Sequence, residues 1–313
     1  MTPDPTGGLP LDRLRDLPRR QERIVTADGA ELHVVRVGTP RDGRRLVVLS
    51  HCWTGDHRVW GPVARRLVSA GCEVVLYDHR GHGASTSGCT SVSLEALADD
   101  LADVLAHVGA SGAVVAGHSM GGMTLQAMAG RRPELMAERV ASVVLVSTAC
   151  TAVLAGVRRR MGPRLVGHRT VNALLARGRL GRFAVRDFVG KDRHRAHLAA
   201  IAETFLSTPG VLRAELLSAM TAMDLTPALS TIAVPVTVVV GSRDRFTPPR
   251  QARCIASAVA GARLLVVPDA GHMLPFEAPD ILASLLAREA GADIAEGDGP
   301  HVAFDGTSLA EAP

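Results

Sequence analysis

The chain has 313 residues, of which 47% are hydrophobic, and its formal net charge at pH 7 is only +4. This content is enough for one large α/β domain with a buried core, whereas so small a charge argues against a general nucleic-acid binder. The five cysteines are scattered, odd in number and without a C-x-x-C pair, which argues against a disulfide framework or a zinc site, so we interpret them mostly as small buried hydrophobic residues.

The N-terminal segment carries no pattern typical of export or membrane insertion. Residues 1–21 mix proline, glycine and charge without the apolar stretch of a signal peptide, and no uncharged apolar run reaches membrane-spanning length. We therefore expect a flexible lead-in over residues 1–21 and a soluble, cytoplasmic protein.

Strands and helices alternate along most of the chain, beginning with two strands joined at Asp28-Gly29. The predicted strands cover residues 24–26, 31–37, 46–50, 73–77, 113–116, 140–146, 236–240 and 263–267. The predicted helices cover residues 59–70, 94–108, 251–259 and 279–289, together with one that starts near residue 120. Alternation of this kind favours a mostly parallel sheet with helices on both faces.

The segment from residue 150 to residue 223 breaks this pattern. It has no clear strand, its pattern is helical, and it carries thirteen lysines or arginines against four acids. An insertion of that length between two sheet strands predicts a cap on a core made of residues 22–149 and 224–290. Residues 291–313 mix glycine, aspartate, alanine and proline without periodicity, so we expect a flexible acidic tail there.

The most informative stretch is an apolar strand followed by Gly117-His118-Ser119-Met120-Gly121 and the start of a helix. This is the nucleophile-elbow pattern, in which a serine sits on a sharp strand-to-helix turn with its hydroxyl clear of the sheet. Gly117 and Gly121 suit that turn because a side chain at either position would meet neighbouring backbone. The helix also aims N–H groups at an oxyanion that develops beside Ser119.

A catalytic serine also needs a base and an acid that orients the base. Asp244 follows the predicted strand at residues 236–240, and His272 follows the predicted strand at residues 263–267. Since the active sites of parallel α/β sheets form at the carboxyl ends of strands, we expect both side chains to meet Ser119 there. The order Ser, Asp, His along the chain is typical of the elbow architecture.

With these residues in place, the chain resembles the α/β-hydrolase superfamily, in the branch of serine esterases and lipases that carry a helical cap. The resemblance covers about residues 22–290. It rests on the motifs Gly117-His118-Ser119-Met120-Gly121, Tyr77-Asp78-His79-Arg80-Gly81-His82-Gly83, Gly241-Ser242-Arg243-Asp244 and Gly271-His272. It implies an α/β-hydrolase fold, with a mostly parallel central sheet flanked by helices and a helical cap insertion.

The resemblance implies a role for each member of the triad. Ser119 would be the nucleophile, His272 the general base and acid, and Asp244 the carboxylate that orients His272. The reaction would be hydrolysis of a small-molecule carboxylic ester through an acyl-enzyme, with no metal or organic cofactor. Alternatives that use the same triad are a thioesterase, a monoacylglycerol-type lipase and a carbon–carbon bond hydrolase. A ligand receptor or a biosynthetic cyclase would use the fold without net hydrolysis.

The resemblance also implies an oxyanion hole made by the backbone N–H groups of Met120 and Trp53. In the loop that carries Trp53, the family's usual His-Gly is replaced by His51-Cys52. This replacement puts Cys52 beside the pocket, so we take Cys52 and Trp53 as candidate substrate-binding residues. The thiol of Cys52 has no neighbour in sequence that would activate it, and we expect it to act by packing.

The remaining histidines and the basic cap carry weaker signals. His51, His79, His82 and His118 do not match a zinc-binding spacing, so we interpret them as hydrogen-bonding groups in loops. The excess of cations in the cap is either a solvated arginine-rich face or an attraction site for an anionic substrate, a lipid surface or an acidic acyl carrier.

Overall fold

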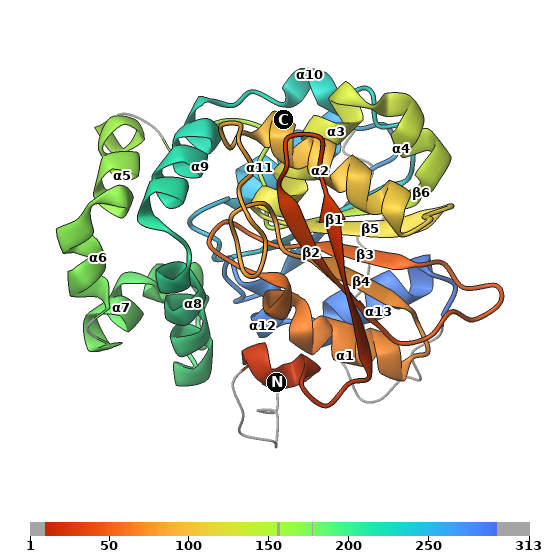
Figure 1. Ribbon diagram of the computed structural model, residues 1–313, viewed down its shortest axis with the longest axis horizontal. Coiled ribbons are helices and arrows are strands. Elements are labelled where there is room, and N and C mark those ends of the chain that lie inside the picture. The colour runs from red at the N-terminus through yellow and green to blue at the C-terminus, as the bar shows by residue number, and fades with distance from the viewer. Residues whose placement is uncertain (1–9, 155–156, 177, 293–313) are drawn as a thin grey trace.

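The computed structural model describes residues 10–154, 157–176 and 178–292, which fold around one eight-stranded sheet (Figure 1). The strands are β1 (Arg19–Val25), β2 (Glu31–Val37), β3 (Val47–Ser50), β4 (Val74–Tyr77), β5 (Ala113–His118), β6 (Val140–Val146), β7 (Val236–Gly241) and β8 (Arg263–Val267). Their order across the sheet is β1-β2-β4-β3-β5-β6-β7-β8. Strands β3 to β8 run parallel and β2 is antiparallel to both neighbours, so the predicted mostly parallel sheet is confirmed.

Helices cover both faces of the sheet. Outside the cap they are η1 (Pro10–Leu14), η2 (His57–Trp60), α1 (Gly61–Ser69), α2 (Leu94–His107), α3 (Met120–Arg131), α4 (Pro133–Arg139), α10 (Thr226–Leu229), α11 (Pro249–Ala258), α12 (Leu274–Glu277) and α13 (Pro279–Glu289). Helices α2, α3 and α11 pack on one face, and α1 and α13 pack on the other. In β3, Val48 belongs to the first core and Val47 and Leu49 to the second. Successive strand residues point to opposite faces, so a strand covered on both sides is apolar throughout.

The N-terminal segment is more ordered than the sequence predicts. Residues expected to form a flexible lead-in include the short helix η1, and β1 already begins at Arg19. Leu11 and Leu14 are buried, and this packing holds η1 against the core. The first five residues of β1 read Arg-Arg-Gln-Glu-Arg, so pairing with β2 and not an apolar pattern defines this strand. Residues 1–9 and the predicted acidic tail from residue 293 onward lie outside the described residues.

The segment between β6 and β7 is helical and lies to one side of the sheet, at the left of Figure 1. Its helices are α5 (Val157–Gly167), α6 (Arg169–Leu175), α7 (Gly178–Ala184), η3 (Arg186–Phe188), α8 (Arg195–Ser207) and α9 (Gly210–Ala222). The chain enters and leaves this cap side by side, because Thr151 and Asp224 form an antiparallel bridge. In the same place the N–H of Leu225 donates to the C=O of Cys150 at 2.7 Å. None of the helices in the described ranges combines the length and the apolar character that a membrane crossing requires.

Candidate active site

Ser119 lies on the turn between β5 and α3. Its backbone is strained, with φ 53° and ψ −113°. A Cβ atom at Gly117 would lie 2.4 Å from the carbonyl oxygen of Gly121, and one at Gly121 would lie 2.4 Å from that of Ser50. Both positions therefore exclude a side chain. The N–H of Ser119 donates to the C=O of Val146 at 2.8 Å, which holds the turn against β6.

His272 and Asp244 meet beyond the carboxyl ends of β8 and β7. The Nδ1 atom of His272 lies 2.8 Å from Oδ2 of Asp244, and both side chains are buried. Thr247, which the sequence analysis missed, donates its hydroxyl to the same Oδ2 at 2.8 Å. Burial alone would raise the pKa of Asp244, but His272 and the hydrogen bonds from Thr247 hold it below its ordinary value. The carboxylate therefore stays ionised beside the imidazole.

Glu277, a second carboxylate that the sequence analysis missed, holds the loop around His272. It accepts the N–H groups of Gly271 and Met273, on either side of His272, at 2.9 and 3.0 Å. It also accepts the N–H of Gly190, a cap residue, at 2.7 Å. The N–H of His272 in turn donates to the C=O of Phe188 in the cap at 2.8 Å. The position of His272 thus depends on the cap as well as on the sheet.

Ser119 and His272 line one small cavity of about 20 Å³. The two predicted pocket residues, Cys52 and Trp53, lie in its wall, while Met120 is the first residue of α3 directly after Ser119. Burial raises the pKa of Cys52 to about 12, so its thiol stays protonated at neutral pH and is unreactive. Of the residues singled out from the sequence, Ser119, His272, Cys52 and Trp53 therefore line this cavity, and Asp244 is linked to it through His272.

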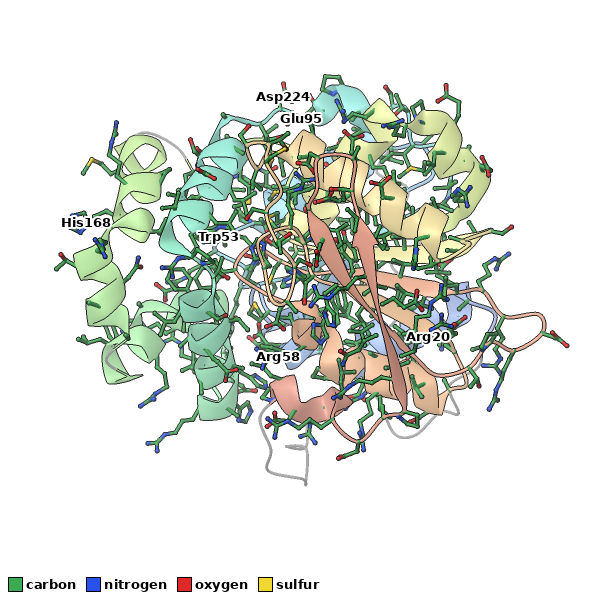
Figure 2. All side chains as sticks on the ribbon, in the orientation of Figure 1. Arg20, Trp53, Arg58, Glu95, His168 and Asp224 are labelled. Carbon is green, nitrogen blue, oxygen red and sulfur yellow. The ribbon has the colours of Figure 1, made fainter. Side chains whose placement is uncertain are left out.

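Trp53 lies where the cap meets the core (Figure 2). Its indole N–H donates to the C=O of Arg213 in the cap at 3.2 Å. Its ring is parallel to that of Phe246, with centroids 6.2 Å apart, and meets Phe205 edge-on at 5.9 Å. Phe188 completes the group, 5.3 Å from Phe246. We call Trp53, Phe188, Phe205 and Phe246 the aromatic collar; it holds four of the nine Phe, Trp and Tyr residues in the chain.

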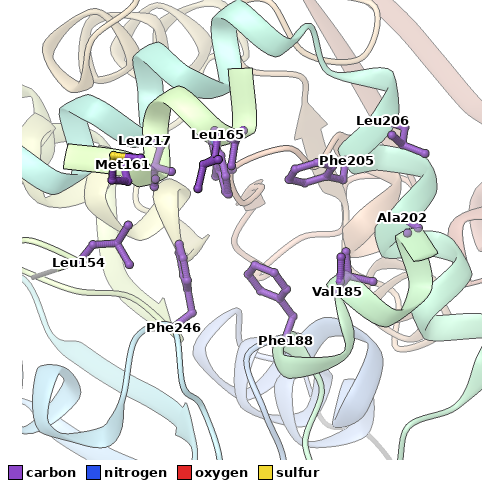
Figure 3. Close-up of a pocket in the computed structure, with 15 residues that line it drawn as sticks. Leu154, Met161, Leu165, Val185, Phe188, Ala202, Phe205, Leu206, Leu217 and Phe246 are labelled. Carbon is purple, nitrogen blue, oxygen red and sulfur yellow. The ribbon is translucent and has the colours of Figure 1, made fainter. Parts of the chain in front are cut away.

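A second, larger cavity lies beyond the collar, between the cap helices (Figure 3). Its volume is about 390 Å³, and we call it the chamber. It is lined by Trp53, Leu154, Met161, Gly162, Leu165, Val166, Gly181, Ala184, Val185, Phe188, Ala202, Phe205, Leu206, Leu217 and Phe246. All four collar residues line both cavities, so the collar separates the chamber from the space beside Ser119.

The other core histidines form hydrogen bonds around the site, from loops in the case of His51, His79 and His82 and from the end of β5 in the case of His118. The Nε2 atom of His51 accepts the N–H of His79 at 2.9 Å, and Nε2 of His118 lies 2.8 Å from the C=O of His272. Burial lowers the pKa of both His82 and His118 to about 3, so these two imidazoles are neutral at physiological pH.

Among the described residues, one group of side chains brings metal-ligating atoms together. It consists of His33, His57 and Asp78, whose ligand atoms all lie within 4.8 Å of one another. The Asp78 carboxylate already has four nitrogen partners: Nδ1 of His33 and of His57, both at 2.9 Å, and the backbone N–H groups of His57 and Ala84 at 2.7 and 3.0 Å. A carboxylate bonded in this way braces β2, η2 and the turn after β4 against one another.

All five cysteines are free. Cys52, Cys72 and Cys150 are buried, as expected of small hydrophobic residues, whereas Cys89 and Cys254 are exposed. The Sγ atoms of Cys150 and Cys254 lie 3.4 Å apart, a proximity that their separation in sequence does not indicate.

Comparison with known proteins identifies similar chains over most of the sequence. The family model described as the alpha/beta hydrolase family matches residues 47–285. A protein of Mycobacterium phage D29 that carries the name of a non-heme haloperoxidase is 31% identical over 279 residues, which cover 86% of this chain and 94% of the phage protein. The non-heme chloroperoxidase of Streptomyces lividans is 29% identical over 75% of this chain and 88% of its own length.

Solved structures with a similar fold include two enzymes with different names. The enol-lactonase of Burkholderia xenovorans LB400 is 28% identical with a TM-score of 0.72, over 86% of this chain and 99% of the lactonase. An esterase of Exiguobacterium antarcticum has a TM-score of 0.76 over the same shares of both chains, and at 20% identity it shows the fold alone. The chain therefore belongs to the alpha/beta hydrolase family, as its sequence motifs predict.

Proposed function

We propose that this chain is a serine hydrolase that cleaves a carboxylic ester through an acyl-enzyme intermediate. One observation carries the proposal: Ser119, on its strained turn, shares a cavity with His272, whose imidazole lies 2.8 Å from Asp244. A nucleophile, a base and an acid that orients the base are the three groups that acyl transfer to serine requires.

In the first half of the reaction, the Ser119 hydroxyl oxygen attacks the ester carbonyl carbon. The Nε2 atom of His272 takes the hydroxyl proton, and Asp244 at Nδ1 stabilises the imidazolium that forms. The backbone N–H groups of Met120 and Trp53 hold the oxyanion, and the position of Met120 at the start of α3 adds the favourable end of the helix dipole. His272 then gives its proton to the leaving alcohol.

In the second half, water attacks the acyl-enzyme. His272 takes a proton from the water and returns one to Ser119, which releases the acid and restores the starting state. A thioester or an activated carbon–carbon bond would pass through the same steps with a different leaving group. A thioesterase, a monoacylglycerol-type lipase and a carbon–carbon bond hydrolase are therefore the alternatives within the family.

A fluorophosphonate probe, which reacts with activated serines, tests the proposal. We expect it to label Ser119 and to stop turnover of a p-nitrophenyl ester, and Ser119→Ala to lower kcat about 10⁴-fold. Ser142→Ala is the matched control, because it removes the hydroxyl of another buried serine on β6 and should leave labelling and turnover unchanged. Labelling of equal intensity in Ser119→Ala would contradict the proposal. Ligand binding without any ester turnover would favour a receptor or a cyclase.

A further inference from the structure

The cavity beside Ser119 is too small for the chain of an ester. Its volume is about 20 Å³, which leaves room for about one water-sized group. The chamber across the aromatic collar has a volume of about 390 Å³. Because the four collar residues line both cavities, the chamber is the adjoining space that could hold a larger substituent of a substrate whose carbonyl lies at Ser119.

The described residues that line the chamber offer its ligand no unpaired polar side chain. Its lining side chains are aliphatic or aromatic, and glycine provides the rest of the wall. Of these residues, Trp53 alone has a nitrogen in its side chain, and that N–H already donates to the C=O of Arg213 at 3.2 Å. Met161 and Leu165 are about half exposed, so the chamber opens to solvent on their side. Against the rest of the wall a charged or hydrogen-bonding group would lose its water and gain no partner, which disfavours its binding there. The lining therefore selects a neutral hydrocarbon.

The volume of the chamber sets the size of that hydrocarbon. An engineered apolar protein cavity of about 150 Å³ accommodates benzene, with its six carbon atoms. On the same scale, the chamber's 390 Å³ corresponds to about a dozen carbon atoms or slightly more. A medium-length alkyl chain or a compact ring system fits this size, whereas an acetyl group would leave most of the space unfilled.

We infer that the chamber binds a neutral hydrocarbon substituent of about a dozen carbon atoms, carried by the substrate whose carbonyl lies at Ser119. The inference rests on the proposed function for the place of the carbonyl. If the hydrocarbon occupies the chamber, any charged group of the substrate lies on the opposite side of the scissile bond.

Two series of esters test the inference and show which half of the ester enters the chamber. The first series varies the acyl chain of p-nitrophenyl esters, and the second varies the alcohol of acetate esters. In one series we expect kcat/KM to rise about fourfold with each added CH₂ up to about twelve carbons and then to fall. The same chain with a terminal carboxylate should react at least about a hundredfold more slowly. A kcat/KM that does not depend on chain length in either series, or an equal kcat/KM for the ester whose chain ends in a carboxylate, would overturn the inference.

Substitutions in the chamber wall provide a second test. Ala202→Phe adds a ring to the α8 side of the chamber, and Leu154→Phe enlarges a side chain on another part of the wall (Figure 3). Ala202→Phe should shorten the preferred chain by about three carbons and Leu154→Phe by about one, because each fills part of the volume in proportion to the bulk that it adds. Val211→Phe is the matched control, since it adds similar bulk to α9 at a side chain that is 69% exposed. An unchanged chain-length profile in both wall variants would contradict the inference.

A binding measurement separates this inference from the proposed function. Methyl ketones of about six to sixteen carbons should bind Ser119→Ala more tightly as the chain grows to about twelve, as measured by calorimetry. If the ketones bind in this way but no probe labels Ser119 in the unmodified protein, the inference stands and the proposed function fails. If Ser119 is labelled and short esters react, but neither binding nor turnover depends on chain length, the inference fails alone.

Discussion

Arg213 is a single residue that holds much of the aromatic collar. Its side chain is only 2% exposed, and its guanidinium donates to the C=O of Phe205 and to Oδ1 of Asn172, both at 2.6 Å. The guanidinium also lies 4.2 Å over the ring of Phe205, and the Arg213 carbonyl accepts the indole N–H of Trp53. Burial lowers the pKa of Arg213, yet an arginine remains charged at physiological pH. Arg213 is therefore a positioning residue for two collar rings.

The variant Arg213→Met removes both hydrogen bonds and the cation–π contact but keeps most of the volume. We expect kcat/KM for a decanoyl ester to fall at least about tenfold, because the loss of even one supporting hydrogen bond costs about 1.4 kcal/mol. An acetyl ester, which does not reach past the collar, should react almost as before. Arg213→Lys keeps the charge but not the planar stack, so its kcat/KM for the decanoyl ester should lie between those of the unmodified protein and of Arg213→Met. Steady-state kinetics measure this selectivity, and an equal fall for both esters would indicate a purely structural role.

At the scale of elements, Asp78 ties β2, η2 and the turn after β4 together through its contacts with His33 and His57. The side chain is fully buried. Burial alone would raise the pKa of Asp78, but His33 and His57 hold it well below its ordinary value. An ionised Asp78 therefore stabilises the folded state, and this turn lies beside the loop that carries Trp53.

The variant Asp78→Asn should lower the free energy of unfolding by about 3 kcal/mol at pH 7, because it leaves the buried imidazole of His33 and the partly buried one of His57 without their charged partner. The folded pKa of Asp78 lies below the unfolded value of about 4, so its contribution is complete above that pH and is lost as the pH falls further. Urea unfolding at pH 7 and near pH 3 measures the difference between the variant and the unmodified protein, which should narrow at the lower pH. A difference that is constant across this range would argue against an ionised Asp78.

The elements differ in how well they can be predicted from their own residues. The strand, turn and helix around Ser119 were predictable because all their signals are adjacent in the chain. Strand β1 was predicted only near its end, over residues 24–26, since its charged first half is a strand only through pairing with β2. Phe188 and Phe205 reach the site through tertiary packing of the cap, which carries no motif. Glu277 likewise gave no local signal, because its backbone partners are defined only when the loop around His272 is folded.

Charge is unevenly distributed over the whole molecule. The cap, residues 150–223, has nine more cations than acids, while the formal net charge of the chain is +4, so the rest sums to −5. Of the cap's four acids, Glu203 pairs with Arg58 of the core at 3.0 Å, and Asp187 lies within 4 Å of Arg245 of the core and of two cap arginines, Arg186 and Arg193. Four acids cannot balance thirteen cations, so the cap keeps a large positive charge. The side chains of residues 158–160, three consecutive arginines, lie outside the described part of the structure.

We propose that this charge draws anionic substrates toward the site. The kcat/KM of an ester whose charged group lies opposite its hydrocarbon chain should fall as salt rises, because the Debye length shrinks from about 10 Å at 0.1 M to about 3 Å at 1 M. A neutral ester with the same chain should be insensitive to salt. Replacing the arginines at 158–160 by glutamine should reduce the salt dependence of the anionic ester. An equal dependence of kcat/KM on salt for the two esters would indicate that the cations of the cap form a solvated basic face without a role in attracting substrate.

The bridge between Thr151 and Asp224 brings the two ends of the cap together, so that the cap is an insertion with adjacent ends. Because β6 and β7 are neighbours in the sheet, removing residues 152–223 and joining the ends by a short linker leaves the order of all eight strands unchanged. A closed loop of about 70 residues also costs little more chain entropy than one half as long. Most of the chamber wall can therefore be exchanged while Ser119, Asp244 and His272 stay on the core, provided that the new segment keeps the backbone contacts that Phe188 and Gly190 make with the loop around His272.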